Sequence, residues 1–173
     1  FALVLAMAVP AFADGATCSI TAPNNGHTYE VYQIFTGTLS EDKGTKVLSD
    51  IKWGKNGTNG DTPVTVGDSV PENVLKEITG VATESDSEKL KVIEKYVDLT
   101  ASKKFNTVSG GIVLNVPAGY YLIKDADNSY NDKHDAYTQF IVEVAGNVNF
   151  KPKTDYPTVE KKVQENSKAT GTT

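Results

Sequence analysis

The sequence predicts a mainly β fold, in which a β-sandwich carries a short helical insertion. Short runs of aromatic and β-branched residues, which favour strands, recur along most of the chain. Glycine, proline and asparagine separate these runs and mark turns. Only residues 71–97 contain stretches with the apolar spacing of helices. Many short strands with one helical insertion are typical of two packed sheets.

Composition bounds the size of the protein and disfavours several classes. The 173 residues allow one full domain and the edge of a second, and 39% hydrophobic residues are enough for a core. The net charge is −5, and all 17 positive side chains are lysine. Because nucleic-acid recognition relies on positive charge and on arginine, we expect no nucleic-acid partner. One cysteine excludes an intrachain disulfide, and with two histidines we expect no metal and no cofactor.

The first residues have the pattern of a secretory signal peptide. An apolar run over residues 1–10, too short to cross a bilayer, leads into an Ala-x-Ala pattern that ends at Ala13. Such a pattern marks a cleavage site, which we place between Ala13 and Asp14. We therefore expect residues 1–13 to be a truncated signal peptide and the mature chain to be exported. A buried N-terminal helix is the alternative.

The early strands are expected at residues 19–22 and 29–36. Alternation assigns the side chains of the second strand to two faces, with Tyr29, Val31, Gln33 and Phe35 on one and Glu30, Tyr32 and Ile34 on the other. Residues 47–53 fit either a short strand or a helical turn. The glycine- and asparagine-rich residues 54–61 fit a loop.

Four later strands are expected to form two hairpins. The first hairpin joins residues 112–116 to residues 120–124 across a Pro-Ala-Gly turn. The second joins residues 137–144 to residues 147–151 across Ala-Gly.

Two helices are expected between the early and the late strands. The first, residues 71–78, has Pro71 at its first helical position. The second, residues 85–97, begins with the capping-box pattern of Ser85 and Glu88. Its apolar stripe is formed by Leu90, Ile93 and Val97. We expect this stripe to pack on the sheet, with a partner-binding helix as the alternative.

No enzyme motif is complete in the chain. The sequence lacks the Gly-Lys-Ser/Thr ending of a phosphate loop, and it contains neither HExxH nor GxSxG. Cys18, with only His27 near it in sequence, is expected to be a buried structural thiol rather than a nucleophile. Asp125 and Asp127 could be an acid–base pair of a secreted hydrolase, but two carboxylates in one loop lack the opposed geometry. We expect no enzyme.

The acidic residues 125–135 have the oxygen density of a calcium loop. They depart from the EF-hand pattern at Tyr130, where glycine is needed, and at Ala136, where glutamate is needed. A solvated loop is therefore expected, and calcium binding is the alternative.

Two lysines near the end of the chain are candidates for chemistry. Lys153 follows Pro152 at the end of the last strand, within a linker of residues 151–157, and a solvated linker charge is the alternative. Lys161 shares a strand face with valines, which is costly unless the amine is neutral, paired or covalently consumed. A one-residue slip of the strand would exchange Lys161 with Lys162.

Four segments carry a family resemblance, residues 26–37, 117–122, 151–153 and 156–163. In this order, behind a signal peptide, they resemble the N-terminal part of Gram-positive backbone pilins, the isopeptide-forming fimbrial subunits that sortase assembles. The resemblance covers about residues 16–163. It implies an immunoglobulin-like N-terminal domain at residues 14–150 and the truncated start of a second, isopeptide-forming domain at residues 158–173.

The resemblance also implies roles for the two lysines. Lys153 would be the sortase acceptor that forms the intermolecular isopeptide bond. Val148, Phe150, Pro152 and Lys153 match the family's V-x-V-Y-P-K spacing, whereas Lys151 replaces the tyrosine and Val144 replaces an expected tryptophan. Lys151 is the nearest competing acceptor. Lys161 would form the intramolecular isopeptide of the second domain, with an asparagine and an acid beyond Thr173.

The first domain is expected to have no cross-link of its own, because its first strand carries no lysine. Asp125 falls where such domains place the promoting acid, and we interpret it as a strand-end aspartate without a partner.

The resemblance implies a structural subunit of covalently polymerised pili, anchored in the cell wall of a Gram-positive bacterium. Its partners would be a pilin-specific sortase and other copies of the subunit. The alternative function is an ancillary pilin or surface adhesin that binds host glycan or matrix.

Overall fold

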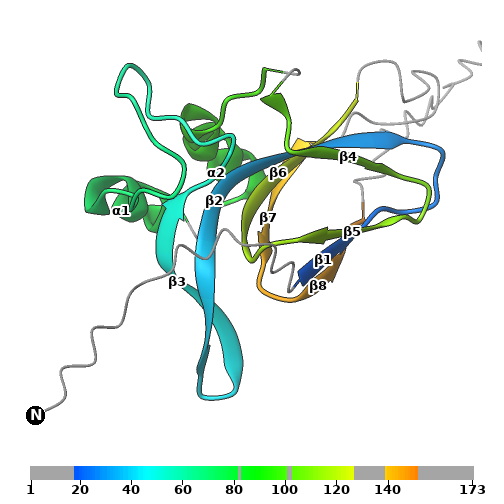
Figure 1. The fold of residues 1–173 in the computed structure, drawn as a ribbon, viewed down its shortest axis with the longest axis horizontal. Coiled ribbons are helices and arrows are strands. Elements are labelled where there is room, and N and C mark those ends of the chain that lie inside the picture. Colours follow the sequence, from blue (N-terminus) through cyan, green and yellow to red (C-terminus); the bar gives the residue numbers. More distant parts are fainter. Residues whose placement is uncertain (1–17, 82, 101–102, 127–138, 152–173) are drawn as a thin grey trace, which may run out of the picture.

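Two β-sheets and a layer of helices make up the described part of the chain (Figure 1). The computed structural model describes residues 18–81, 83–100, 103–126 and 139–151. Strands make up 45% of the structure and helices 18%. The prediction of a mainly β fold is therefore confirmed.

The larger sheet is built around the long strand β2 (Thr28–Asp42). On one edge, β2 pairs with β6 (Gly119–Asp125), which in turn pairs with β7 (Gln139–Val144). On the other edge, β2 pairs with β4 (Asn106–Ser109) near its start and with β3 (Thr45–Trp53) near its end. All of these pairings are antiparallel. Residues 47–53, which fitted a strand or a helical turn, are thus a strand.

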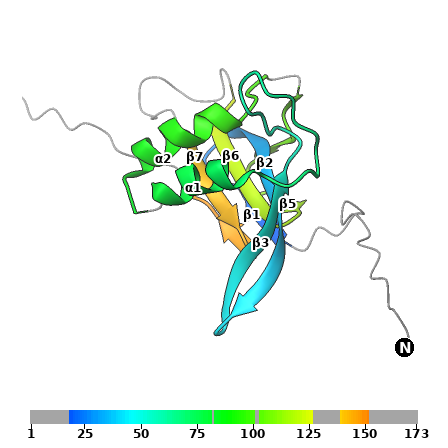
Figure 2. The same cartoon turned by 90° about the vertical axis from the view of Figure 1, so that its left-hand side faces the viewer.

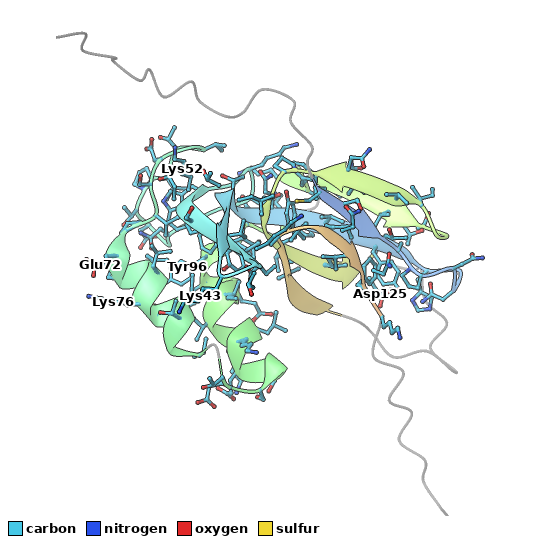
Figure 3. All side chains as sticks on the ribbon, turned by 90° about the horizontal axis from the view of Figure 1, so that it is seen from below. Lys43, Lys52, Glu72, Lys76, Tyr96 and Asp125 are labelled. Atoms are coloured by element: carbon cyan, nitrogen blue, oxygen red, sulfur yellow. The ribbon has the colours of Figure 1, made fainter. Side chains whose placement is uncertain are left out.

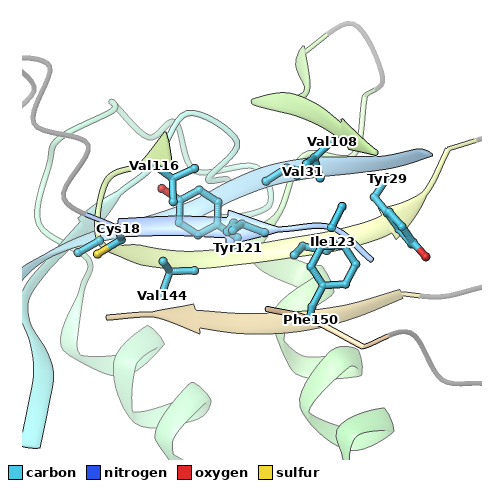
Figure 4. Close-up of a cluster of buried hydrophobic side chains, with 12 residues drawn as sticks. Cys18, Tyr29, Val31, Val108, Val116, Tyr121, Ile123, Val144 and Phe150 are labelled. Atoms are coloured by element: carbon cyan, nitrogen blue, oxygen red, sulfur yellow. The ribbon is translucent and has the colours of Figure 1, made fainter. Parts of the chain in front are cut away.

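The smaller sheet joins segments from both ends of the described chain. Its central strand is β1 (Cys18–Thr21), which pairs antiparallel with β5 (Val113–Val116) and parallel with β8 (Asn147–Asn149). This sheet packs against one face of the larger sheet and encloses the first core cluster (Figure 4). The fully buried members of that cluster are Ile20, Tyr29, Val31, Val116, Tyr121, Ile123 and Val144.

The helices cover the opposite face of the larger sheet (Figure 2). These are α1 (Glu72–Gly80), α2 (Asp86–Ile93) and a short 3₁₀ turn, η1 (Glu94–Tyr96). Together with the sheet they bury the second core cluster, which contains Tyr32, Ile34, Phe35, Trp53, Val74, Ile93, Tyr96, Val97 and Leu122. Leu90 packs against this cluster. The apolar stripe of the second helix therefore packs on the sheet, as predicted.

The predicted capping residue of α2 is confirmed, whereas α1 begins one residue later than predicted. Ser85 is the N-cap of α2, and its Oγ accepts a hydrogen bond from the backbone N–H of Glu88 at 3.4 Å. Pro71 is the N-cap of α1, with an extended ψ of 146°, and is not its first helical residue. Its carbonyl accepts the first bonds of the helix, from the N–H groups of Val74 and Leu75, so the helix proper begins one residue later than predicted.

A β-bulge in β2 corrects the predicted faces of this strand. Gln33 pairs with Tyr121, but Phe35 pairs with Tyr120, so two residues of β2 oppose one residue of β6. The extra residue turns Phe35 to the helical side, where it joins Ile34 in the second core cluster. The prediction that Phe35 shares a face with Tyr29 and Val31 was therefore wrong, whereas the assignments of those two residues, of Tyr32 and of Ile34 are confirmed.

Both predicted hairpins were wrong, although their strands exist. The strand before Pro117 pairs with β1 and the strand after it pairs with β2 and β7, so this connection crosses from one sheet to the other. The Ala145–Gly146 connection makes a similar crossing, because β8 pairs with β1. Gly119 lies so close to the backbone of β2 that a Cβ there would overlap the carbonyl oxygen of Phe35. The glycine is thus needed for sheet packing rather than for a tight hairpin turn.

Candidate functional site

The site that the sequence singled out lies where the chain leaves the smaller sheet, in a segment we call the exit segment, residues 148–151. Phe150 is only 5% exposed, and its ring meets that of Tyr29 edge-on at 4.9 Å. Its backbone N–H donates to the carbonyl of Thr21 at 3.4 Å. Val148 also packs against the first core cluster. These contacts hold the exit segment to the domain.

Strand alternation in the exit segment decides which side chains reach solvent. Val148 and Phe150 point inward, whereas Asn149 and Lys151 are exposed. The structure therefore presents the amine of Lys151, the competing acceptor, at the surface directly after an anchored aromatic residue.

Several predicted site residues lie outside the described residues. These are Lys153 and Lys161, the signal-cleavage pair Ala13 and Asp14, and Pro152. The first-domain bounds at residues 14–150, the linker at residues 151–157 and the second-domain start at residues 158–173 extend into the same parts of the chain. The roles assigned to these residues stay predictions.

A buried histidine–aspartate pair lies beside the exit segment, and sequence reasoning missed it. Nδ1 of His27 lies 2.8 Å from Oδ1 of Asp125, with Asp125 fully buried and His27 6% exposed. Asp125 ends β6, and Figure 3 shows it at the end of the molecule away from the helices. The expectation that Asp125 has no partner was wrong.

This pair connects to the exit segment through aromatic rings. The ring of His27 stacks on Tyr29 at 5.8 Å, and Tyr29 contacts Phe150. The amide of Asn25 donates to the hydroxyl of Tyr29 at 2.7 Å. His27 and Asp125 are 98 positions apart, so no local pattern could have joined them. Through Tyr29, the arrangement links the buried His27–Asp125 pair to the exit segment.

A second buried polar group, the Glu30 cluster, consists of Glu30, Tyr32, Lys104 and Lys124. Oε2 of Glu30 accepts a hydrogen bond from the hydroxyl of Tyr32 at 2.7 Å and pairs with the Lys124 amine at 3.0 Å. Its Oε1 accepts from the Lys104 amine at 3.2 Å. Glu30 and Lys124 are direct cross-strand partners in the β2–β6 ladder.

The electrostatics of the Glu30 cluster favour an ion pair. Burial raises the pKa of Glu30, but hydrogen bonds from Tyr32, Lys124 and Lys104 outweigh it and hold the pKa below the usual range. The cluster is therefore an ion pair, in which Glu30 lies between the amines of Lys104 and Lys124.

Cys18 forms no disulfide and is 3% exposed, in the first core cluster. The prediction of a buried thiol is confirmed, and burial of this kind shields a thiol from reagents in solution.

Within the described ranges, no three His, Cys, Asp or Glu residues lie close enough to hold a metal ion. Most of the acidic residues 125–135 fall outside those ranges. Among the helices of the described chain, none has the length and apolar character needed to cross a membrane. Comparison of the sequence with models of protein families and with curated proteins finds no match.

Proposed function

We propose that this chain is the N-terminal region of a backbone subunit of covalently polymerised pili, exported and anchored in the wall of a Gram-positive bacterium. The observation that carries the proposal is the order of the four pilin-like segments behind an apolar leader. We also propose that the two sheets form an immunoglobulin-like sandwich. The partly buried Val148 and the buried Phe150, at alternate positions of the acceptor motif, support an anchored strand before the acceptor lysine.

The proposed reaction joins two subunits through an amide bond. A pilin-specific sortase holds the cleaved C-terminal end of one subunit as a thioester. The neutral Nζ of Lys153 attacks the thioester carbonyl, so that a C–N bond forms and the C–S bond breaks. The amine gives up a proton, and the cysteine of the sortase leaves as a thiol. No cofactor is consumed.

The anchored exit segment supports this chemistry by restricting the acceptor. Lys153 lies three residues after Phe150 in the chain. Three residues span at most about 10–11 Å when fully extended, so the Cα of Lys153 cannot lie farther than that from the Cα of Phe150. A tethered acceptor is offered to the enzyme at a defined edge of the domain, which raises its effective concentration there.

Co-expression of the full-length subunit with a pilin-specific sortase tests the proposal. Lys153→Arg keeps the positive charge but replaces the nucleophilic amine with a guanidinium that is not deprotonated in proteins. We expect wild type to form a ladder of heat-stable multimers on a denaturing gel and Lys153→Arg to lose it. Lys151→Arg is the matched control and should keep the ladder.

Each outcome assigns a role. A ladder that survives Lys153→Arg and is lost with Lys151→Arg would move the acceptor to Lys151. The absence of a ladder in the wild type would contradict the backbone-subunit proposal and favour an ancillary pilin or adhesin.

A further inference from the structure

The loop between β3 and α1 contains two of the three Asn–Gly pairs of the sequence. These are Asn56–Gly57 and Asn59–Gly60, and the third is Asn25–Gly26. Asparagine before glycine is chemically labile, because glycine has no side chain to hinder attack on the asparagine amide. In the folded protein, the three pairs differ in burial and in hydrogen bonding.

We propose that Asn59 is a self-modification site, at which the folded protein converts the asparagine to aspartate or isoaspartate while Asn56, three residues earlier, is protected. This inference is independent of the proposed function.

The reaction needs only the chain and water. The backbone nitrogen of Gly60 attacks Cγ of Asn59, so that an N–Cγ bond forms and the Cγ–Nδ2 bond breaks. The proton of the Gly60 N–H leaves with Nδ2 as ammonia, and a five-membered imide remains. Water then opens the imide at one of its two carbonyls, which yields aspartate or isoaspartate.

The surroundings of Asn59 leave this reaction free to proceed. Its side chain makes no hydrogen bond with another described residue. Gly60 is exposed, with φ of +56°, and nothing lies within 4 Å of the position that a Cβ would occupy. The Asn59 amide, which is partly buried, can therefore turn toward the backbone nitrogen of Gly60 without breaking a hydrogen bond to another described residue.

Asn56 has the opposite surroundings. It is 1% exposed, its Oδ1 accepts from the N–H of Gln33 at 2.9 Å, and its Nδ2 donates to the carbonyl of Lys103 at 2.6 Å. Gly57 is tightly packed, because a Cβ there would lie 2.7 Å from the ring of Trp53. Cyclisation would break both side-chain hydrogen bonds of Asn56. Two bonds of ordinary net strength correspond to roughly a thirtyfold slower reaction.

Asn25 lies between these extremes. Its Oδ1 accepts from the N–H of His27 at 3.1 Å and its Nδ2 donates to Tyr29, but the residue is exposed and Gly26 is open. We therefore expect the order of rates to be Asn59, then Asn25, then Asn56.

The consequence of the modification should stay local. The N–H of Thr58 donates to the carbonyl of Tyr96 at 3.0 Å, and Gly57 forms a β-bridge with Val97, so the loop is fastened on the N-terminal side of Asn59. The carbonyl of Asn59 accepts from the N–H of Thr62 at 3.1 Å. Isoaspartate inserts a methylene into the backbone of this turn and adds a negative charge, so the turn changes while the anchored base of the loop does not.

Peptide mapping by mass spectrometry tests the proposal on the intact chain. Trypsin cleaves after Lys55 and Lys76, so one peptide contains both Asn56 and Asn59 and gives their ratio directly. The protein is aged at mildly alkaline pH, and fragmentation of the peptide locates the exchange of amide for acid. We expect conversion at Asn59 to exceed that at Asn56 by roughly thirtyfold in the folded protein.

Two controls make the result specific to the fold. In denaturant the protection of Asn56 should be lost, and the two rates should converge. Asn59→Gln, whose longer side chain cannot close the five-membered imide, should abolish conversion at position 59 without altering position 56. Equal rates at Asn56 and Asn59 in the folded protein, or conversion at Asn59 only in denaturant, would overturn the proposal.

Discussion

Replacing Glu30 with glutamine preserves the shape of this side chain and removes the charge at the centre of the Glu30 cluster. A glutamine would keep its carbonyl oxygen toward Tyr32 and Lys124 and turn its amide toward Lys104. The bond to Lys104 is lost, because the amide and the amine both donate, but Lys104 is 36% exposed and this bond is partly screened. The larger loss is the charge assistance of the bond to Lys124, whose side chain is only 13% exposed. Bonds to a charged group contribute about 1.5–3 kcal/mol, so we expect Glu30→Gln to lower the free energy of unfolding by about 2 kcal/mol at neutral pH.

The pH dependence of this difference gives a sharper test than its size. The pKa of Glu30 is below its ordinary value of 4.5 in the folded protein, so the folded state holds the proton less tightly than the unfolded chain. The stabilisation is therefore complete above about pH 4.5 and is lost as the pH falls through the lower folded value. Glutamine cannot titrate, so wild type and Glu30→Gln should converge in stability under acid.

Urea denaturation of both proteins at a series of pH values measures the difference. Glu72→Gln is the matched control, because Glu72 pairs with Lys76 on an exposed face of α1, and its change should stay below about 0.5 kcal/mol. A Glu30→Gln difference that is constant from neutral to acid pH would refute the argument that the carboxylate charge stabilises the fold.

Two further predictions concern packing. Gly119→Ala should lower the free energy of unfolding by more than about 2 kcal/mol in thermal or urea denaturation, because the new Cβ would overlap the carbonyl of Phe35. Gly146→Ala is the control, and it should change stability little because the space around Gly146 is open. Phe150→Ala should lower the free energy of unfolding by about 3–5 kcal/mol in urea denaturation, since the buried ring that holds the exit segment is lost. Unchanged stability in Phe150→Ala would show that the exit segment is not held by this ring.

Local signals predicted the elements of this fold better than their pairing. The serine cap and the apolar stripe of α2 depend on residues three or four apart, and both were found in the sequence. Strand pairing depends on distant partners. Two apolar strands joined by a short turn fit a hairpin and a crossing between sheets equally well, and at Pro117 and Gly146 the crossing occurs. The bulge at Ile34 also could not be inferred from the alternation of residue types in β2.

The candidate site could be predicted from the sequence only where its residues are neighbours in the chain. The alternation of Val148, Phe150 and Lys151 follows from strand geometry and agrees with the motif spacing. The pairing of His27 with Asp125 joins residues 98 positions apart and could not be inferred from either neighbourhood. Glu30 and Lys124 would have been found once β2 was paired with β6 in the correct register.

The position of β1 between β5 and β8 determines the order in which the domain can be completed. Ser19 bonds to Asn147, 128 positions later, so β1, the first strand of the described chain, meets its partner β8 only when nearly all of the described chain is available. Because the chain is synthesised from its N-terminus, β1 is present before β8. Until β8 is available, Ile20 and the thiol of Cys18 are exposed to solvent and to other chains. Closure of so long a loop is slow compared with local helix formation. The interval before β8 arrives is therefore the time at which a nascent domain is most vulnerable to thiol oxidation and to aggregation.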